Sequence, residues 1–118
     1  FVAAGAKELT VLIRAIGPSL IPLGVGDTLV DPKLELYNNA TQAKLFENND
    51  WSSPIAPISS TAAQLAATFT AVGAFPLAGS STKDAVLLVK LPPGAYSAKV
   101  SAADGGGGMA IVEVYEVP

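Results

Sequence analysis

The stretch that decides the fold is Glu8–Ile16, which reads Glu-Leu-Thr-Val-Leu-Ile-Arg-Ala-Ile. Its residues are mostly apolar and often β-branched, and only Glu8 and Arg14 carry a charge. A run of this composition and length is typical of a buried β-strand. Gly17-Pro18 ends the strand, because proline has no N–H to donate to a neighbouring strand.

Five further strands are expected from the same kind of pattern. They are Lys33–Tyr37, Ala43–Glu47, Asp84–Leu91, Ala95–Ala102 and Met109–Val117. The first two are predicted to form a hairpin around Asn38-Asn39, because asparagine tolerates the positive φ that such turns require. The last three are separated by Pro92-Pro93-Gly94 and by the glycine-rich turn Asp104–Gly108.

One segment favours a helix. Thr61–Val72 is rich in alanine, and Ser60 or Thr61 is suited to cap its N-terminus. A strand at Ala67–Ala71 is the alternative. We therefore predict an all-β, antiparallel β-sandwich of Greek-key or jelly-roll type over residues 1–118, as a single domain with at most one short helix near 61–72.

Composition limits the classes of function. Only 14% of the 118 residues are charged, against roughly 25% in typical domains. The net charge is −3, and no basic run suggests nucleic-acid binding. No stretch approaches the roughly 20 apolar residues of a membrane-spanning helix. The chain has neither cysteine nor histidine. A surface with so few charges is poorly protected against association with other molecules.

Two of the expected strands are apolar on both faces. Asp84–Leu91 is apolar throughout until Lys90, and Met109–Val117 carries Ala110, Val112 and Val114 on one face and Ile111, Glu113 and Tyr115 on the other. A two-layer sandwich covers only the inner face of each sheet. The outer faces therefore require a helix, a loop or another molecule.

The segment Val11–Leu20 resembles the Val-Leu-Ile-Arg-Ala-x-Gly-Pro-Ser-Leu signature of a family of bacterial secreted and surface β-sandwich domains. Similar blocks follow in the same order along most of the chain: Asp31–Tyr37, Asn48–Trp51, Val72–Phe75, Leu91–Tyr96 and Val112–Tyr115. The family is remotely similar to jelly-roll domains appended to secreted peptidases. The resemblance implies a bacterial domain that is extracellular or on the cell surface, with no catalytic residues to assign. It also implies a further strand before Phe1.

Candidate chemistry is sparse. Ser19 has no histidine or cysteine to activate it, so a turn serine is expected and no enzyme is predicted. No cofactor is predicted, and Ca²⁺ is the most serious alternative. Asn48, Asn49 and Asp50 offer clustered oxygens, with Asp27, Asp31 or Asp84 as further candidates, but they lack the spacing of a calcium-binding loop.

Three other groups of residues have candidate roles. Arg14 lies in an apolar strand and must be paired or reach water, which makes Glu113 its most economical partner, with a contact to a neighbouring subunit as the alternative. Core packing is the commoner role for the aromatic residues. The alternative is a platform for a sugar or matrix ligand, formed by Trp51, Phe46, Tyr37, Tyr96 and Tyr115. Asn39-Ala40-Thr41 matches a glycosylation acceptor sequence on the expected hairpin turn.

These observations predict a structural protein whose partners are copies of itself. The expected assembly interface comprises the terminal strand-like segments, Phe1, Val2, Ala3 and Ala4 together with Ile111, Glu113 and Tyr115. The product would be a filament, a pilus-like fibre or a surface layer, and deletion of Phe1–Ala4 would abolish it. The alternative is a non-catalytic accessory domain, binding carbohydrate or matrix, of a secreted bacterial enzyme.

Overall fold

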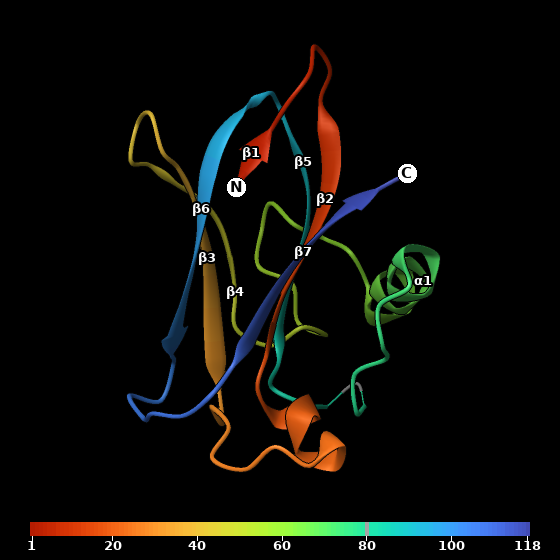
Figure 1. The fold of residues 1–118 in the computed structure, drawn as a ribbon, viewed down its shortest axis with the longest axis vertical. Coiled ribbons are helices and arrows are strands. Elements are labelled where there is room, and N and C mark those ends of the chain that lie inside the picture. Colours follow the sequence, from red (N-terminus) through yellow and green to blue (C-terminus); the bar gives the residue numbers. More distant parts are fainter. Residues whose placement is uncertain (80) are drawn as a thin grey trace.

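Two antiparallel sheets and one α-helix form three layers in the computed structural model, which describes residues 1–79 and 81–118. The first sheet contains, in order, β1 (Val2–Ala3), β6 (Gly94–Ala102), β3 (Pro32–Asn38) and β4 (Lys44–Asn48). The second contains β5 (Ala85–Leu91), β2 (Leu9–Ile16) and β7 (Ile111–Val117). Helix α1 spans Ala62–Val72 and the 3-10 helix η1 spans Pro18–Leu23. Figure 1 shows the second sheet between the first sheet and α1. The predicted all-β, sandwich-like fold is confirmed.

Strand β2 is the central strand of the second sheet, as expected of a buried apolar run. It pairs with β5 along one edge and with β7 along the other. Its side chains alternate between two cores: Ile13 packs between the sheets, whereas Leu12 packs against the layer that contains α1. Both faces of β2 are therefore covered by the chain itself.

Two apolar cores hold the layers together. The core between the sheets takes buried residues from β1, β2, β3, β5 and β6, including Leu34, Leu36 and Leu87. The second core lies between the second sheet and α1, and it contains Trp51, Phe69 and Val86 among its buried residues. Together the cores explain why β5 is buried on both sides over most of its length.

Helix α1 begins at a capping box. The Thr61 hydroxyl accepts a hydrogen bond from the Gln64 N–H, and the Gln64 side chain accepts one from the Thr61 N–H. Leu65 and Phe69, four residues apart, lie on the buried face. The helix ends at Gly73, whose φ of 76° is left-handed. The helix is confirmed, and the alternative strand at Ala67–Ala71 is wrong.

The position of α1 changes one expectation. The outer face of β5 was expected to need a covering element or another molecule, and the helical layer supplies that cover from within the chain. The apolar outer face of β5 therefore gives no argument for a partner. No helix among the described residues is long and apolar enough to cross a membrane.

The β3–β4 hairpin is present, but its turn differs from the expected one. Positive φ falls on Gln42, at 60°, and not on Asn38 or Asn39. Instead, Asn38 Oδ1 accepts hydrogen bonds from the N–H groups of Ala40 and Thr41. Asparagine thus contributes to this turn through its side chain, which can mimic a backbone turn, while Gln42 adopts the positive φ. Asn39, the first residue of the acceptor-like sequence, is exposed here, and its Oδ1 accepts a hydrogen bond from the Ser97 hydroxyl.

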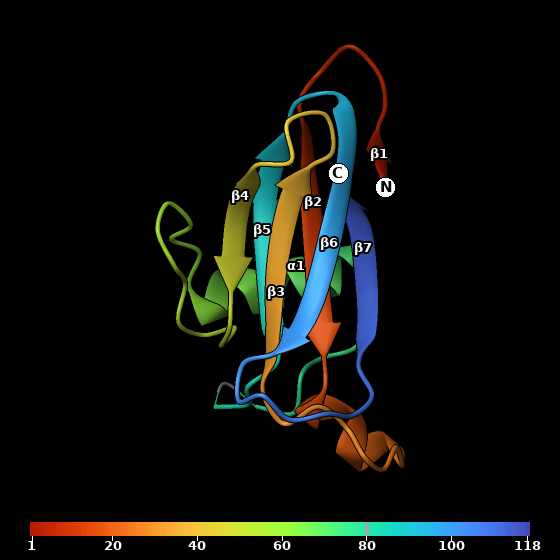
Figure 2. The same cartoon turned by 90° about the vertical axis from the view of Figure 1, so that its left-hand side faces the viewer.

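Most connections cross from one sheet to the other. Only the β3–β4 hairpin joins neighbouring strands of one sheet, whereas β1–β2, β2–β3, β4–β5, β5–β6 and β6–β7 change sheet. As a result, β4 and β5 lie on one side of the sandwich, and β1, β6 and β7 lie on the other (Figure 2). Both sides end in edge strands: β4 and β5 form the edges on the first side, and on the second the edges are β7 and the part of β6 with which β1 does not pair.

Candidate functional site

The side of the sandwich bordered by β6 and β7 carries two strand edges with no neighbouring strand over most of their length. On β6, strand β1 pairs only at Gly94 and Ala95, and the terminal amine and carbonyl of Phe1 exchange hydrogen bonds with the backbone of Tyr96. From Ser97 to Ala102 no described strand pairs with this edge of β6. The outer edge of β7 is likewise unpaired among the described residues. We call this side, with the edges of β6 and β7, the open side.

Apolar side chains on the inner face of β7 remain exposed at the open side. Val112 and Val114 pair with Ala15 and Ile13 of β2, so they point toward the core between the sheets. Even so, they are 45% and 43% exposed. On β6, Ala98 and Val100 point inward and are only partly buried. The sandwich is therefore not closed along this side.

The predicted interface residues fall into three groups. Val2 is exposed, but Ala3 is buried in the chain's own core, so β1 already completes its own sheet. Ile111 is exposed. Glu113 and Tyr115 face the helical layer and bond to each other. Strand β7, which the sequence analysis named, lies at the open side, but its exposed valines are on the face opposite to Ile111, Glu113 and Tyr115.

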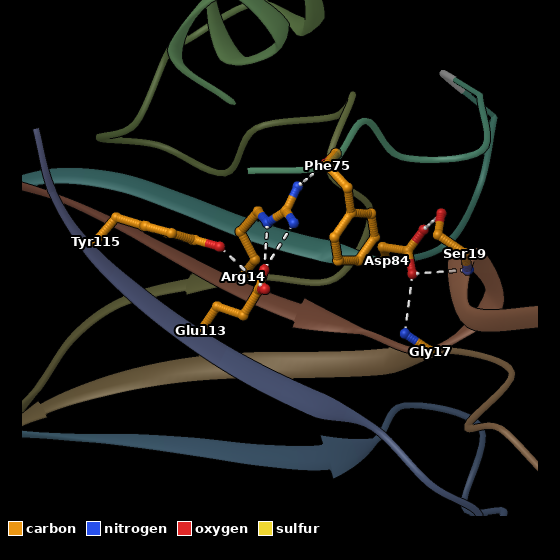
Figure 3. Close-up of polar contacts among 7 residues, drawn as sticks. All are labelled: Arg14, Gly17, Ser19, Phe75, Asp84, Glu113 and Tyr115. Atoms are coloured by element: carbon orange, nitrogen blue, oxygen red, sulfur yellow. Dashed lines mark hydrogen bonds and ion pairs between the residues drawn. The ribbon is translucent and has the colours of Figure 1, made fainter. Parts of the chain in front are cut away.

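Arg14 and Glu113 are brought together by the pairing of β2 with β7, in which they are direct cross-strand neighbours. Arg14 Nε donates to Glu113 Oε1 at 2.8 Å, and Nη2 lies 2.6 Å from the same oxygen without the alignment of a hydrogen bond. Nη1 donates to the Phe75 carbonyl at 2.7 Å (Figure 3). The guanidinium lies over the rings of Phe69 and Phe75. The Arg14 side chain is fully buried.

Tyr115 completes this group of side chains. Its hydroxyl donates to Glu113 Oε2 at 3.0 Å. Burial and then this hydrogen bond raise the pKa of Tyr115 above its ordinary value. The tyrosine therefore stays protonated and serves as a donor to Glu113. The arrangement fixes β7 against β2 and attaches the 73–79 segment to the sheet through Phe75.

A second buried polar group has Asp84 as its centre, and the sequence did not indicate it. Asp84 is fully buried just before β5. It accepts hydrogen bonds from the N–H groups of Gly17 and Ser19 and from the Ser19 hydroxyl, at 2.9, 3.2 and 2.6 Å (Figure 3). The Ser19 oxygen in turn accepts from the Ala78 N–H. Asp84 thus caps the turn after β2, and Ser19 links that turn to Ala78.

The glycine of this turn is required by a close approach of the backbone. A Cβ at Gly17 would collide with the carbonyl oxygen of Leu29. Only the Gly17-Pro18 pair was predicted to have a role, as the end of the strand. Its acidic partner lies more than 60 residues away, which local spacing cannot reveal.

Of the three weak metal candidates, Asn48 is bound within the fold, whereas Asn49 Oδ1 is buried without a hydrogen-bond partner among the described residues. Asn48 is fully engaged: its Oδ1 accepts from the Val86 N–H, and its Nδ2 donates to the carbonyls of Asp50 and Ser53. Within the described residues, no group of three or more histidine, cysteine, aspartate or glutamate side chains is placed to hold a metal ion. Asn48 instead links β4 to β5.

The negative charge of Asp31 lowers the stability of the fold. Burial raises its pKa, as do the negative charges of Asp50 and Asp104, whereas Lys83 opposes them. Because the folded pKa exceeds the unfolded one, the ionised carboxylate weakens folding at neutral pH, and this cost is lost as the pH falls through the folded pKa. We expect Asp31→Asn to stabilise the fold at pH 7 by about 1 kcal/mol or less, since the site is partly solvated.

Thermal melts of the Asp31→Asn variant and the parent chain, at neutral and at acidic pH, test this prediction. The two proteins should converge in acid, where the parent carboxylate is protonated. A variant that is less stable at neutral pH would mean that the ion pair with Lys83, 3.9 Å away, outweighs burial and repulsion.

The aromatic residues do not form a shared platform in the described structure. Tyr96 lies in the core between the sheets and stacks on Phe1. Trp51 lies in the helical core, is 5% exposed, and donates its indole N–H to Gly79 O and Thr82 Oγ1. Phe46 packs against the first core and Tyr115 against the second. These placements favour packing roles over sugar stacking.

Comparison with known proteins gives no indication of function. No family model, no curated protein and no solved structure was found to match this chain. The function is therefore argued from the open side itself.

Proposed function

We propose that this chain is a structural, non-enzymatic subunit that associates with copies of itself through the open side. The observation that carries the proposal is the pair of half-exposed, inward-pointing valines, Val112 and Val114, beside strand edges that lack a neighbour. An unpaired edge offers N–H and C=O groups to an additional strand. A strand from a second copy would satisfy these groups and cover both valines in one step.

Charge does little to oppose such a contact. Edge strands that avoid association commonly carry lysines or prolines. Strand β7 carries neither, and its two acidic residues are Glu113, which is bound to Arg14, and Glu116. On β6, Lys99 is the only charged residue and lies on the outer face, opposite Glu35. Neither strand uses an inward-pointing lysine to block pairing.

The expected strength of one contact is modest. Burying the exposed halves of two valines contributes about 1 kcal/mol each, and each net backbone hydrogen bond contributes about 1 kcal/mol. Association costs at least roughly 4 kcal/mol in lost freedom of motion. Pairing therefore becomes visible only at high protein concentration or where copies are held close together. An assembly on a bacterial cell surface, or a fibre outside the cell, meets the second condition.

Sedimentation velocity over a concentration series into the high micromolar range tests the proposal. We expect the parent chain to form species larger than a monomer. Val114→Lys should remove them, because a lysine on the inner face of an edge strand opposes pairing. Val30→Lys is the matched control: Val30 is exposed, but it lies outside both edge strands.

Two outcomes count against the proposal. One is a clean monomer for the parent chain at every concentration, and the other is association that survives Val114→Lys.

Deletion of Phe1–Ala4, which the sequence suggested as a test of assembly, is a less direct test of the open side. Because β1 pairs with its own β6, its removal lengthens the free edge and also takes Ala3 out of the core.

A further inference from the structure

A second surface of the molecule is free of charge and is distinct from the open side. From Trp51 to Thr82 the sequence contains no aspartate, glutamate, lysine or arginine, although 14% of the whole chain is charged. This segment includes α1 and much of the layer over the outer face of the second sheet. An uncharged surface of this extent cannot select a charged ligand.

This layer contains a pocket of about 350 Å³. It is lined by Trp51, Ala66, Phe69, Thr70, Ala74, Pro76, Leu77 and Gly79. The rings of Trp51 and Phe69 are tilted by 43° with their centroids 5.6 Å apart, so two aromatic surfaces meet at the pocket. A volume near the lower end of the range for ligand sites accommodates one small ring.

The polar groups of the pocket narrow the class of ligand. The Trp51 indole N–H is already donated to Gly79 O and Thr82 Oγ1, and the Thr70 hydroxyl donates to the Ala66 carbonyl. What remains for a ligand are oxygen lone pairs, which accept hydrogen bonds. A charged ligand would lose its hydration without gaining an ionic partner.

Arg14 does not change this conclusion, although its guanidinium lies 4.8 Å from the centroid of the Phe69 ring. Its donors face Glu113 and the Phe75 carbonyl, and it is fully buried beneath the helical layer. The guanidinium therefore packs against the Phe69 ring from the interior of the protein, and its charge is not accessible to a ligand in the pocket.

We propose that this pocket binds a neutral, single-ring apolar molecule, packed against Trp51 and Phe69 and carrying at most one hydrogen-bond donor. Phenol and iodobenzene represent the class. This binding site is separate from self-association and does not depend on it. Thr70 Oγ1 is the acceptor available to a single donor such as a phenolic hydroxyl, because Gly79 O already accepts from Trp51 and Thr82.

Trp51 makes the proposal directly testable, because it is the only tryptophan in the chain. Iodobenzene is a suitable probe, since its heavy atom quenches indole fluorescence on contact. The test compares the parent chain with Ala66→Leu, which fills the pocket, and with Ala63→Leu, which adds the same side chain to an exposed position of α1 that does not line it. Leucine is a good helix former, so neither change should disturb α1.

We expect saturable quenching in the parent chain and in Ala63→Leu, with binding at least about tenfold weaker in Ala66→Leu. Circular dichroism and thermal melts establish that both variants are folded. Quenching that rises linearly and equally in all three proteins would overturn the proposal. So would a loss of self-association in Ala66→Leu without any change in quenching, because a second copy would then occupy the pocket.

Discussion

Arg14→Ala should lower the free energy of unfolding by about 3–5 kcal/mol, the usual cost of removing one partner from a buried ion pair. The guanidinium is fully buried, and Glu113, whose side chain is 20% exposed, would be left without its cation. The Phe75 carbonyl would lose its donor, and the Phe69 and Phe75 rings would lose the group on which they pack. The substitution therefore weakens both the β2–β7 pairing and the attachment of the helical layer.

Urea denaturation followed by circular dichroism measures this loss. Lys44→Ala is the matched control, because Lys44 also pairs with glutamates but is 42% exposed, and exposed pairs contribute about 1 kcal/mol or less. The double variant Arg14→Met with Glu113→Leu should recover much of the stability, since an apolar pair of similar size leaves no charge unpaired. An Arg14→Ala protein as stable as the parent would show that water reaches Glu113 and replaces the cation.

The Arg14–Glu113 contact is an example of a feature that local sequence patterns can predict. Each residue is a charge in an otherwise apolar strand, and a buried charge needs a partner, so the sequence alone predicted this pair. The same kind of reasoning placed β2, β5, β6 and β7 close to their observed bounds. It also gave α1, because alanine-rich composition and a capping threonine are local signals.

Features that depend on tertiary placement were not predictable in the same way. Strand β5 is apolar on both faces because α1 covers its outer face, whereas the sequence left the covering element open. On β7 both faces carry apolar residues, and only the strand order of the sheets shows that Val112 and Val114 lie at an uncovered side. Sequence likewise cannot show that Trp51 packs beside Phe69 in the helical core, apart from the tyrosines and Phe46 with which it was grouped.

Asp84 is the clearest case of a residue whose role the sequence did not reveal. From the sequence, its oxygens indicate only a contribution to a calcium site. In the structure these oxygens are occupied by Gly17 and Ser19, which are distant in sequence. No periodicity or spacing connects an aspartate that precedes one strand with a turn that follows another. The contact nevertheless accounts for one of the two largest effects of substitution that we expect.

Asp84→Ala should cost about 3 kcal/mol or more, because it leaves two backbone N–H groups and one hydroxyl without an acceptor in a buried setting. Each unsatisfied buried polar group costs about 1–3 kcal/mol, and the three do not add fully, since the turn can relax. The loss should be large because Asp84 is fully buried and water cannot easily take its place. Asp104→Ala is the matched control: Asp104 also accepts a backbone hydrogen bond in a turn, but an exposed one.

Asp84→Asn separates the hydrogen bonds from the side-chain volume. An asparagine keeps one oxygen to accept from the Gly17 and Ser19 N–H groups. It presents an NH₂ group to a Ser19 oxygen that already accepts from Ala78, so the serine hydroxyl loses its acceptor. We therefore expect a loss of about half that of Asp84→Ala, and a similar one for Ser19→Ala. Denaturation curves of the three variants and Asp104→Ala measure this order. If Asp84→Ala and Asp104→Ala were equally mild, Asp84 would not hold the turn after β2.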